Sequence, residues 1–414
     1  MEKVPICLVG CGGMGQRHIL GFRELEDSRI GNLDLVAVCD VRPENAALCA
    51  REAERLLGRK PAVFTDVGDA LAHPDVAAVD VTTDPRTHHT IAVGALLAGR
   101  HALVEKPLGL TVRACRAVVD AAEKSGAVLA TAENLRRDPV NRLARAVIDG
   151  GLLGDPYLMI NKRLGGDDRM IITPWRHLKE RSAIALDAGV HEADIIQYYM
   201  GEFDRMYGLG MIVEPVRRRG PDAGLDLESY RERFREFPET IEATGEDAII
   251  AIYRMKSGAM VQFSFILAGR GSHSWERSVH GRFGALLSPG DRNGRPVVLR
   301  LEGRELRGRE ILPLLRGFEM SEITDRLFGK GGVEYDLDFL PADAKHTAIE
   351  LHDFGEAILT GRQPEVGGRL GTTATAAILG VYESALAGRS VTMDEVLSGR
   401  VREYQRELDE GLGL

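Results

Sequence analysis

The first third of the chain alternates short apolar runs with segments in which apolar residues recur at helical spacing. The apolar runs predict strands at 4–9, 33–40, 62–64, 77–83, 101–107 and 127–134. The segments between them predict helices up to about residue 26 and over 43–57, 88–99 and 112–124, the last with Thr111 as its N-cap. This alternation indicates an α/β fold with a doubly wound parallel sheet joined by right-handed crossovers.

The rest of the chain follows a different pattern, in which several strand-like runs come between helices. Strands are predicted at 156–164, 204–213, 247–255, 259–268, 275–287 and 295–301, and helices over 187–200, 345–360 and 372–387. The parallel pattern stops near residues 134–139. We therefore expect two domains, 1–135 and 136–414, with the active site in the cleft between them.

Composition limits the partners. The 414 residues carry a formal net charge of −9, which argues against nucleic acid or an anionic membrane surface. The run Arg217-Arg218-Arg219 favours a solvated loop over a phosphate or substrate contact. No apolar stretch approaches the ~20 residues that cross a bilayer, and no secretory signal is recognised. The cysteines are odd in number and never spaced as CxxC, which predicts buried thiols in a reducing cytoplasm: Cys7, Cys11, Cys39, Cys49 and Cys115.

A glycine-rich turn follows the first predicted strand. Gly10 permits a tight turn, Gly12 lets the backbone approach a pyrophosphate, and Gly15 lets the next helix pack close to the strand. The N-terminus of that helix offers free N–H groups to the phosphates. Asp40 ends the second strand, where it can bind both ribose hydroxyls and repel a 2′-phosphate, so NAD is favoured, while Arg42 leaves NADP possible. The alternative is a glycine-rich turn without a nucleotide.

Further polar residues end other strands, where doubly wound sheets bind their ligands. They are Thr83, Glu105-Lys106-Pro107 and Glu133-Asn134. The ammonium group of Lys106 would lie near the nicotinamide, where it can hydrogen-bond a substrate hydroxyl. A surface lysine is the alternative, but the flanking acid and proline fix its direction and favour a function.

A second cluster lies on the helix predicted over 187–200. Asp187, His191 and Asp194 are spaced so that all three project from one side. A histidine held by a carboxylate is the usual construction of a general base. A metal site is disfavoured, because three ligands on one helix have no outside partner. Asp187 as a helix cap and His191 as a core histidine remain alternatives.

These motifs occur in one order along the chain: Gly10-Cys11-Gly12-Gly13-Met14-Gly15, Glu105-Lys106-Pro107, Trp175-Arg176 and Asp187-x-Gly189-x-His191-x-x-Asp194. Together they resemble the glucose–fructose oxidoreductase/inositol dehydrogenase/rhizopine-catabolism family of NAD(P)-dependent oxidoreductases, over nearly the whole chain. The resemblance implies an N-terminal Rossmann domain and a C-terminal α+β domain. The second domain would present an open-faced, mainly antiparallel sheet that is often used for dimerisation.

The resemblance also implies roles for individual residues. His191 would be the general base for the hydroxyl being oxidised, Lys106 would orient and polarise that oxygen, and Asp187 would be a proton partner or substrate ligand. The expected cofactor contacts are Gly10, Gly12, Gly13, Met14, Gly15, Asp40, Arg42, Thr83, His88, Glu105 and Lys106. The expected substrate contacts are Asn134, Arg163, Trp175, Arg176, Asp187 and His191, with His177 as a further polar candidate.

The sequence departs from the family pattern in three places. Ser182-Ala183-Ile184-Ala185 replaces the usual glycine run before the Asp187 motif, and Thr83-Asp84-Pro85 replaces threonine followed directly by proline. His88 nevertheless keeps its distance from Glu105. Residues 214–245 look like an insertion with an amphipathic helix near 225–236, which we interpret as a lid or an oligomer contact, or as a solvated excursion.

Three functions stay open. The family mostly oxidises secondary alcohols of sugars, glycosides or cyclitols, so the first is a dehydrogenase that exchanges NAD(H) each cycle. The second is a redox-neutral enzyme that retains NAD and oxidises transiently to allow epimerisation, elimination or glycoside cleavage. The third is a non-catalytic NAD-binding sensor, ranked last because Lys106, Asp187 and His191 are all present. The expected partners are a carbohydrate or cyclitol and further copies of this chain, as a homodimer or homotetramer through the C-terminal sheet.

Overall fold

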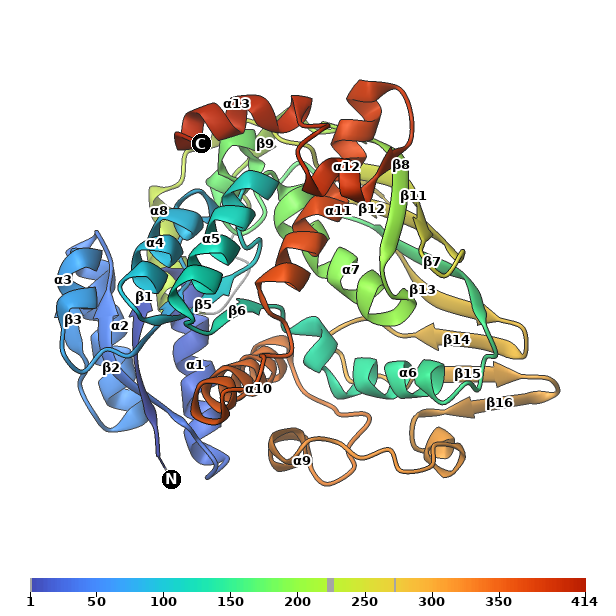
Figure 1. Ribbon diagram of the computed structural model, residues 1–414, viewed down its shortest axis with the longest axis horizontal. Coiled ribbons are helices and arrows are strands. Elements are labelled where there is room, and N and C mark those ends of the chain that lie inside the picture. The colour runs from blue at the N-terminus through green and yellow to red at the C-terminus, as the bar shows by residue number, and fades with distance from the viewer. Residues whose placement is uncertain (1, 222–226, 272) are drawn as a thin grey trace.

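The apolar runs of the first third form one parallel sheet in the computed structural model, which describes residues 2–221, 227–271 and 273–414. The strand order is β3-β2-β1-β4-β5-β6. This is the doubly wound arrangement that the alternation predicts, with the carboxyl ends of β1 and β4 side by side. Figure 1 shows this sheet in blue to teal, in the left half of the molecule. The strands are β1 (Val4–Val9), β2 (Leu33–Cys39), β3 (Ala62–Phe64), β4 (Ala78–Val81), β5 (His101–Glu105) and β6 (Leu129–Ala132).

Alternate residues of these strands enter two different cores. Ile6 and Leu8 pack with α1 (Gly13–Asp27) and α2 (Pro43–Leu57), whereas Cys7 and Val9 pack with α4 (Pro85–Leu97) and α5 (Val112–Ser125). Both faces of the sheet are therefore covered, which explains why its strands read as continuous apolar runs. The Thr111 side chain accepts a hydrogen bond from the Ala114 N–H, which confirms the predicted N-cap.

The second sheet has nine strands, and all neighbours in it are antiparallel except β7 and β12. Its order is β16-β15-β14-β13-β7-β12-β11-β8-β17. One face packs against α6 (Pro139–Asp149), α7 (Ile184–Met200) and α11 (Gly368–Ala387). The strands are β7 (Pro156–Leu164), β8 (Phe203–Met211), β11 (Ala248–Met255), β12 (Met260–Ile266), β13 (Ser274–Gly281), β14 (Gly284–Ser288), β15 (Val298–Leu301), β16 (Arg304–Arg307) and β17 (Val391–Thr392).

The other face of this sheet is open. In β11, Ile249, Ala251 and Tyr253 are buried, whereas Ile250 and Ile252 are 56% and 57% exposed. Apolar side chains of the neighbouring strands are exposed on this face as well, namely Tyr207, Leu209, Met211 and Met260. The structure thus confirms the α+β domain with an open-faced, mainly antiparallel sheet.

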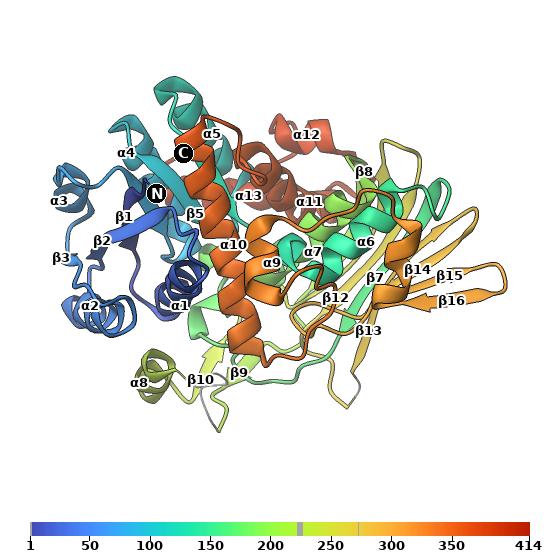
Figure 2. The same cartoon turned by 90° about the horizontal axis from the view of Figure 1, so that it is seen from below.

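One helix from the end of the chain returns to the first sheet. Helix α10 (Phe339–Thr360) lies beside α1 (Figure 2), and its residues Ile349, Leu351 and Phe354 belong to the core formed by Ile6 and Leu8. A division of the chain at residue 135 therefore leaves α10, together with Ile323 and Leu327 of the first core, in the later segment.

The proposed insertion contains a small hairpin of β9 (Val216–Arg218) and β10 (Thr240–Glu242), with α8 (Glu228–Glu236) between them. The start of the predicted helix, 225–226, lies outside the described residues. The solvated-loop interpretation of the arginine run is wrong for Arg217. Its side chain is fully buried, binds the Asp247 carboxylate, and donates to the Asp167 carbonyl at 2.7 Å.

Other differences concern short elements. The strand predicted at 275–287 is two strands, β13 and β14, separated by a turn. Helices and strands that the pattern did not predict are α3 (Val67–Ala72), α6, α9 (Glu322–Phe328), α12 (Met393–Leu397), α13 (Glu403–Leu412), β9, β10, β16 and β17. All five cysteines are buried and free. Among the described helices, none is both long and apolar enough to cross a membrane.

Candidate active site

Two adjoining cavities lie at the carboxyl ends of strands of the first sheet. The glycine-turn cavity, about 690 Å³, is lined by Gly10, Gly12, Gly13 and Asp40. The His191 cavity, about 860 Å³, is lined by Lys106, Asp187 and His191. The residues that line both cavities are Met14, Ile172 and Arg176. A ligand that fills the first cavity can therefore reach the second.

The glycines have the steric roles that their spacing predicts. Gly10 has φ +101°, and a Cβ there would come within 2.7 Å of the Thr83 nitrogen. A Cβ at Gly15 would come within 2.2 Å of the Gly10 carbonyl oxygen, so this glycine allows α1 to pack on β1. Gly12 is the N-cap residue of α1 and makes no side-chain capping hydrogen bond, which leaves the first N–H groups of the helix available to an anion.

The adenosine end of this cavity is acidic. The Asp40 carboxylate accepts hydrogen bonds from the Cys11 N–H at 2.8 Å and from the Arg42 N–H at 2.9 Å. The guanidinium of Arg42 is held by two other carboxylates, Glu44 at 2.8 Å and Glu236 at 3.4 Å. A 2′-phosphate here would meet three carboxylates and an arginine already engaged. Together with the glycine turn, these carboxylates fit the ribose hydroxyls of NAD better than the 2′-phosphate of NADP.

Lys106 and Asp187 form a buried pair in the His191 cavity. The Lys106 Nζ donates to the Asp187 carbonyl at 3.0 Å and to its Oδ1 at 3.2 Å. The Arg176 Nη1 lies 3.1 Å from Oδ2 of the same carboxylate. Burial opposes ionisation of Asp187, but the Arg176 and Lys106 cations outweigh it and lower its pKa below the usual value. An ammonium has three N–H donors, so Lys106 keeps one for a ligand.

His191 is held by Glu133, not by Asp187 as its helix spacing suggested. Its Nδ1 lies 2.6 Å from Glu133 Oε2, and Nε2 is left for the cavity. Burial, together with the Lys106 and Arg292 cations, lowers the pKa of His191 to about 3. Burial also raises the pKa of Glu133 well above its usual value, and the nearby Asp194 acts in the same direction. Both shifts favour an uncharged pair.

Asp194 does not belong to the cluster that the sequence predicted. Its carboxylate binds the Arg136 guanidinium through both oxygens, at 2.5 and 2.8 Å, and it does not line either cavity. The described residues contain no group of three potential ligands that could hold a metal.

Glu105 connects the His191 cavity to a buried histidine of α1, His18. Its Oε1 lies 3.2 Å from His18 Nε2, and His18 Nδ1 lies 2.7 Å from Asp80. Burial opposes the charges, but the two carboxylates raise the pKa of His18 well above its usual value. Burial similarly opposes ionisation of Glu105, whereas His18 and Lys106 lower its pKa to about 2. Glu105 and Lys106, both expected at the cofactor, line the His191 cavity.

The other predicted residues divide between the two cavities. Asn134 and Arg163 line the His191 cavity, and the Asn134 Oδ1 accepts from Arg292 at 2.6 Å. Arg42, Thr83 and Trp175 line the glycine-turn cavity, and Trp175, expected at the substrate, does not line the His191 cavity. His88 and His177 line neither: the His88 ring lies between the carbonyl oxygens of Pro107 and Thr83, and His177 accepts from the Ile171 N–H.

Some lining residues had no recognisable signal in the sequence. Arg17 pairs with Asp343, to which Arg292 also binds, and both arginines line the His191 cavity. Asp343 is 326 residues from Arg17 along the chain. Glu133 did carry a signal, because it lies at the end of a predicted strand, but nothing in the sequence linked it to His191.

The departure at residues 182–185 produces an unusual backbone. Ala183, just before α7, has φ +56° and ψ 143°, a conformation that glycine adopts much more easily. The chain therefore keeps the geometry of a glycine here without having one.

Two models of one family match consecutive parts of the chain. The oxidoreductase family with an NAD-binding Rossmann fold matches residues 4–133, and the GFO/IDH/MocA C-terminal domain matches residues 141–287. Inositol 2-dehydrogenase from Burkholderia cenocepacia (strain HI2424) is 30% identical over 232 residues, 54% of this chain and 61% of that protein. D-apiose dehydrogenase from Paraburkholderia graminis is 30% identical over 209 residues, 50% of this chain and 52% of that protein.

Solved structures cover more of the chain at lower identity. An oxidoreductase domain protein from Kribbella flavida has a TM-score of 0.77 at 22% identity, over 95% of this chain and 100% of that one. Levoglucosan dehydrogenase in complex with NADH and L-sorbose has a TM-score of 0.75 at 21% identity, over 95% and 99% of the two chains. These likenesses show a shared fold. The two family models, in the order and at the places of the two sheets, establish that the chain belongs to the GFO/IDH/MocA family of oxidoreductases and begins with its NAD-binding Rossmann domain.

Proposed function

We propose that the protein is an NAD-dependent dehydrogenase that acts on a secondary alcohol of a sugar, glycoside or cyclitol. The observation that carries this proposal is the His191–Glu133 pair beside Lys106, in a cavity that opens onto the glycine-turn cavity. Relatives named inositol 2-dehydrogenase and D-apiose dehydrogenase support the substrate class.

NAD bound on the glycine turn would accept the hydride from the carbinol carbon. His191 takes the hydroxyl proton at Nε2, and its Nδ1 proton can pass to Glu133 across 2.6 Å. The pair then ends as a neutral imidazole and a neutral carboxylic acid, which is the form that burial favours. Glu133 thus allows a deeply buried histidine to take up a proton without becoming a buried cation.

Lys106 binds the same substrate oxygen through its remaining N–H and stabilises negative charge there as the proton leaves. Asp187 holds the ammonium in place through its carbonyl and its carboxylate. Because Arg176 and Lys106 keep the pKa of Asp187 low, anchoring suits this residue better than proton transfer.

The test is absorbance at 340 nm with purified protein, NAD and a panel of sugars, glycosides, uronic acids and inositols, with product chromatography on the same samples. One equivalent of NADH per product with one class supports the dehydrogenase. Product without net NADH would contradict the dehydrogenase and support the redox-neutral enzyme that retains NAD. NAD binding without any product from the panel favours the sensor.

A further inference from the structure

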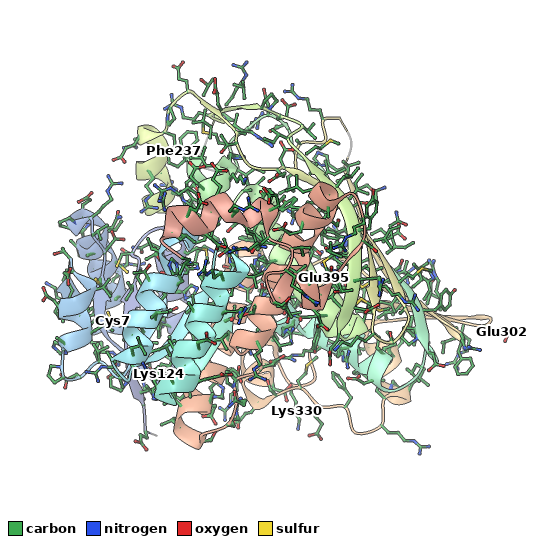
Figure 3. All side chains as sticks on the ribbon, turned by 45° about the horizontal axis from the view of Figure 1, so that its top comes forward. Cys7, Lys124, Phe237, Glu302, Lys330 and Glu395 are labelled. Atoms are coloured by element: carbon green, nitrogen blue, oxygen red, sulfur yellow. The ribbon has the colours of Figure 1, made fainter. Side chains whose placement is uncertain are left out.

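The insertion helix α8 contacts α1 of the first domain, and two arginines before it in the chain hold the insertion in place. Arg217, in β9, is buried against Asp247. The Arg219 guanidinium donates to the Phe237 carbonyl, just after α8, at 3.0 Å and lies over the Phe234 ring. Figure 2 shows α8 next to α1 and the β9–β10 hairpin, and Figure 3 labels Phe237 at its C-terminal end.

One face of α8 lines the glycine-turn cavity. Tyr230 and Arg233 are three residues apart and lie on one face of the helix, and Phe237 directly follows its last residue. All three line this cavity. These residues therefore run from the first turn of α1 towards the Asp40 end.

Tyr230 and Arg233 touch the glycine turn at the two positions closest to an expected pyrophosphate. A Cβ at Gly12 would meet the Arg233 guanidinium at 2.8 Å, and a Cβ at Gly13 would meet the Tyr230 ring at 2.4 Å. Tyr230 is only 4% exposed. The Arg233 guanidinium is the end of a flexible side chain, so it can shift to admit a phosphate and still bind it.

The ion pair at the C-terminal end of α8 agrees with this arrangement. Glu236, the last residue of α8, lies 3.4 Å from the Arg42 guanidinium, next to Asp40. The helix thus presents an anion beside the ribose end and a cation beside Gly12. This order matches a dinucleotide, whose negative charge lies in its central pyrophosphate.

From this geometry we propose that α8 forms part of the dinucleotide site. Arg233 binds the pyrophosphate opposite the N-terminus of α1, and Tyr230 closes the same side beside it, so the cofactor is enclosed by both domains and dissociates slowly. The inference rests on the dinucleotide site of the proposed function and is independent of the sugar. An arginine binds phosphate oxygens through two parallel hydrogen bonds, which gives it both strength and direction.

The experiment compares the wild-type protein with Arg233→Ala, Arg233→Lys and the control Arg235→Ala. Arg235 is an exposed arginine of the same helix, outside both cavities, so its loss changes the net charge equally. NADH binding is followed by fluorescence titration, and NADH dissociation by stopped-flow displacement with excess NAD. ADP-ribose and AMP are titrated as ligands with and without a pyrophosphate, and thermal melting confirms that each variant is folded.

In Arg233→Ala, the affinity for NADH and for ADP-ribose is expected to fall by about 10–100-fold, mainly through faster dissociation. The affinity for AMP should change much less. Arg233→Lys should recover part of the affinity, and Arg235→Ala should bind like the wild type. Unchanged binding in Arg233→Ala would overturn the proposal. Tighter binding would also overturn it, because Arg233 would then compete with the cofactor. These readouts need no turnover, so they stay informative if no sugar is oxidised.

Discussion

At the scale of single residues, the site is organised around the difficulty of burying charge. His191 and Glu133 lie 2.6 Å apart, and burial pushes the pKa of each towards its neutral form. Burial also opposes ionisation of Asp187, but the Arg176 and Lys106 cations beside its carboxylate lower its pKa below the usual value. One pair can therefore exchange a proton at little electrostatic cost, while the other provides a fixed charge.

Replacing His191 by Ala should lower turnover by about 10²–10⁴-fold, the usual contribution of a general base. NADH binding should stay within a few-fold of the wild type, because His191 does not line the glycine-turn cavity. Steady-state kinetics and fluorescence titration measure the two effects. His280→Ala, outside both cavities, is the matched control. Wild-type turnover in His191→Ala would remove this residue from the mechanism.

The pH dependence of oxidation should report the His191–Glu133 pair. Oxidation needs the pair with one proton, so kcat/KM falls on the acid side as the pair gains its second proton. Because burial raises the pKa of Glu133, this acid limb should lie well above pH 4.5. Ketone reduction should show the mirror image and decline as pH rises through the same value.

Replacement of Glu133 by Gln leaves the imidazole to titrate alone. Burial lowers the pKa of His191 to about 3, so the acid limb of the variant should move to lower pH while the maximal rate falls. A pH series of kcat/KM for both proteins tests this. An acid limb that keeps its position in Glu133→Gln would show that another group controls it.

At the scale of elements, periodicity predicted what depends on neighbours along the chain. The runs at 62–64 and 156–164 form β3 and β7 with the predicted bounds, because the apolar run of β3 and the alternating burial along β7 depend only on residues within each strand. Helix α6 was not predicted, although Asp138 and Pro139 are a typical N-cap and first residue of a helix. The parallel pattern ends near the same residues, which were therefore interpreted as a domain boundary. Burial of Arg217 depends on Asp247, 30 residues away, and no local pattern records it.

The backbone before α7 offers a test at this scale. Ala183 has φ +56°, so Ala183→Gly should relieve strain of about 1–3 kcal/mol, offset by about 0.5–1 kcal/mol for the more flexible unfolded chain. The net expectation is a higher melting temperature, measured by calorimetry. Ala185→Gly, inside the first turn of α7, is the control and should lower it. Equal destabilisation by both changes would contradict strain at Ala183.

At the scale of the molecule, the site joins parts that are distant in sequence. Arg17 from α1 binds Asp343 from α10, and Glu133 after β6 binds His191 from α7. The candidate catalytic residues could be named from motifs, but their pairing depends on how the domains meet. The insertion was recognised as extra sequence, whereas its contact with Gly12 and Gly13 became visible only in three dimensions.

The open face of the nine-stranded sheet carries the last prediction. Exposed apolar side chains from β8, β11 and β12 form one continuous surface there, of a kind that usually marks an interface. We propose that two copies of the chain pair through it. Light scattering after gel filtration should then give a multiple of the 45.3 kDa chain mass. The double change Ile250→Glu and Ile252→Glu should give the single-chain mass, because it would bury like charges. Leu97→Glu, on the exposed side of α4, should leave the assembly intact. A wild-type protein of single-chain mass would exclude this pairing.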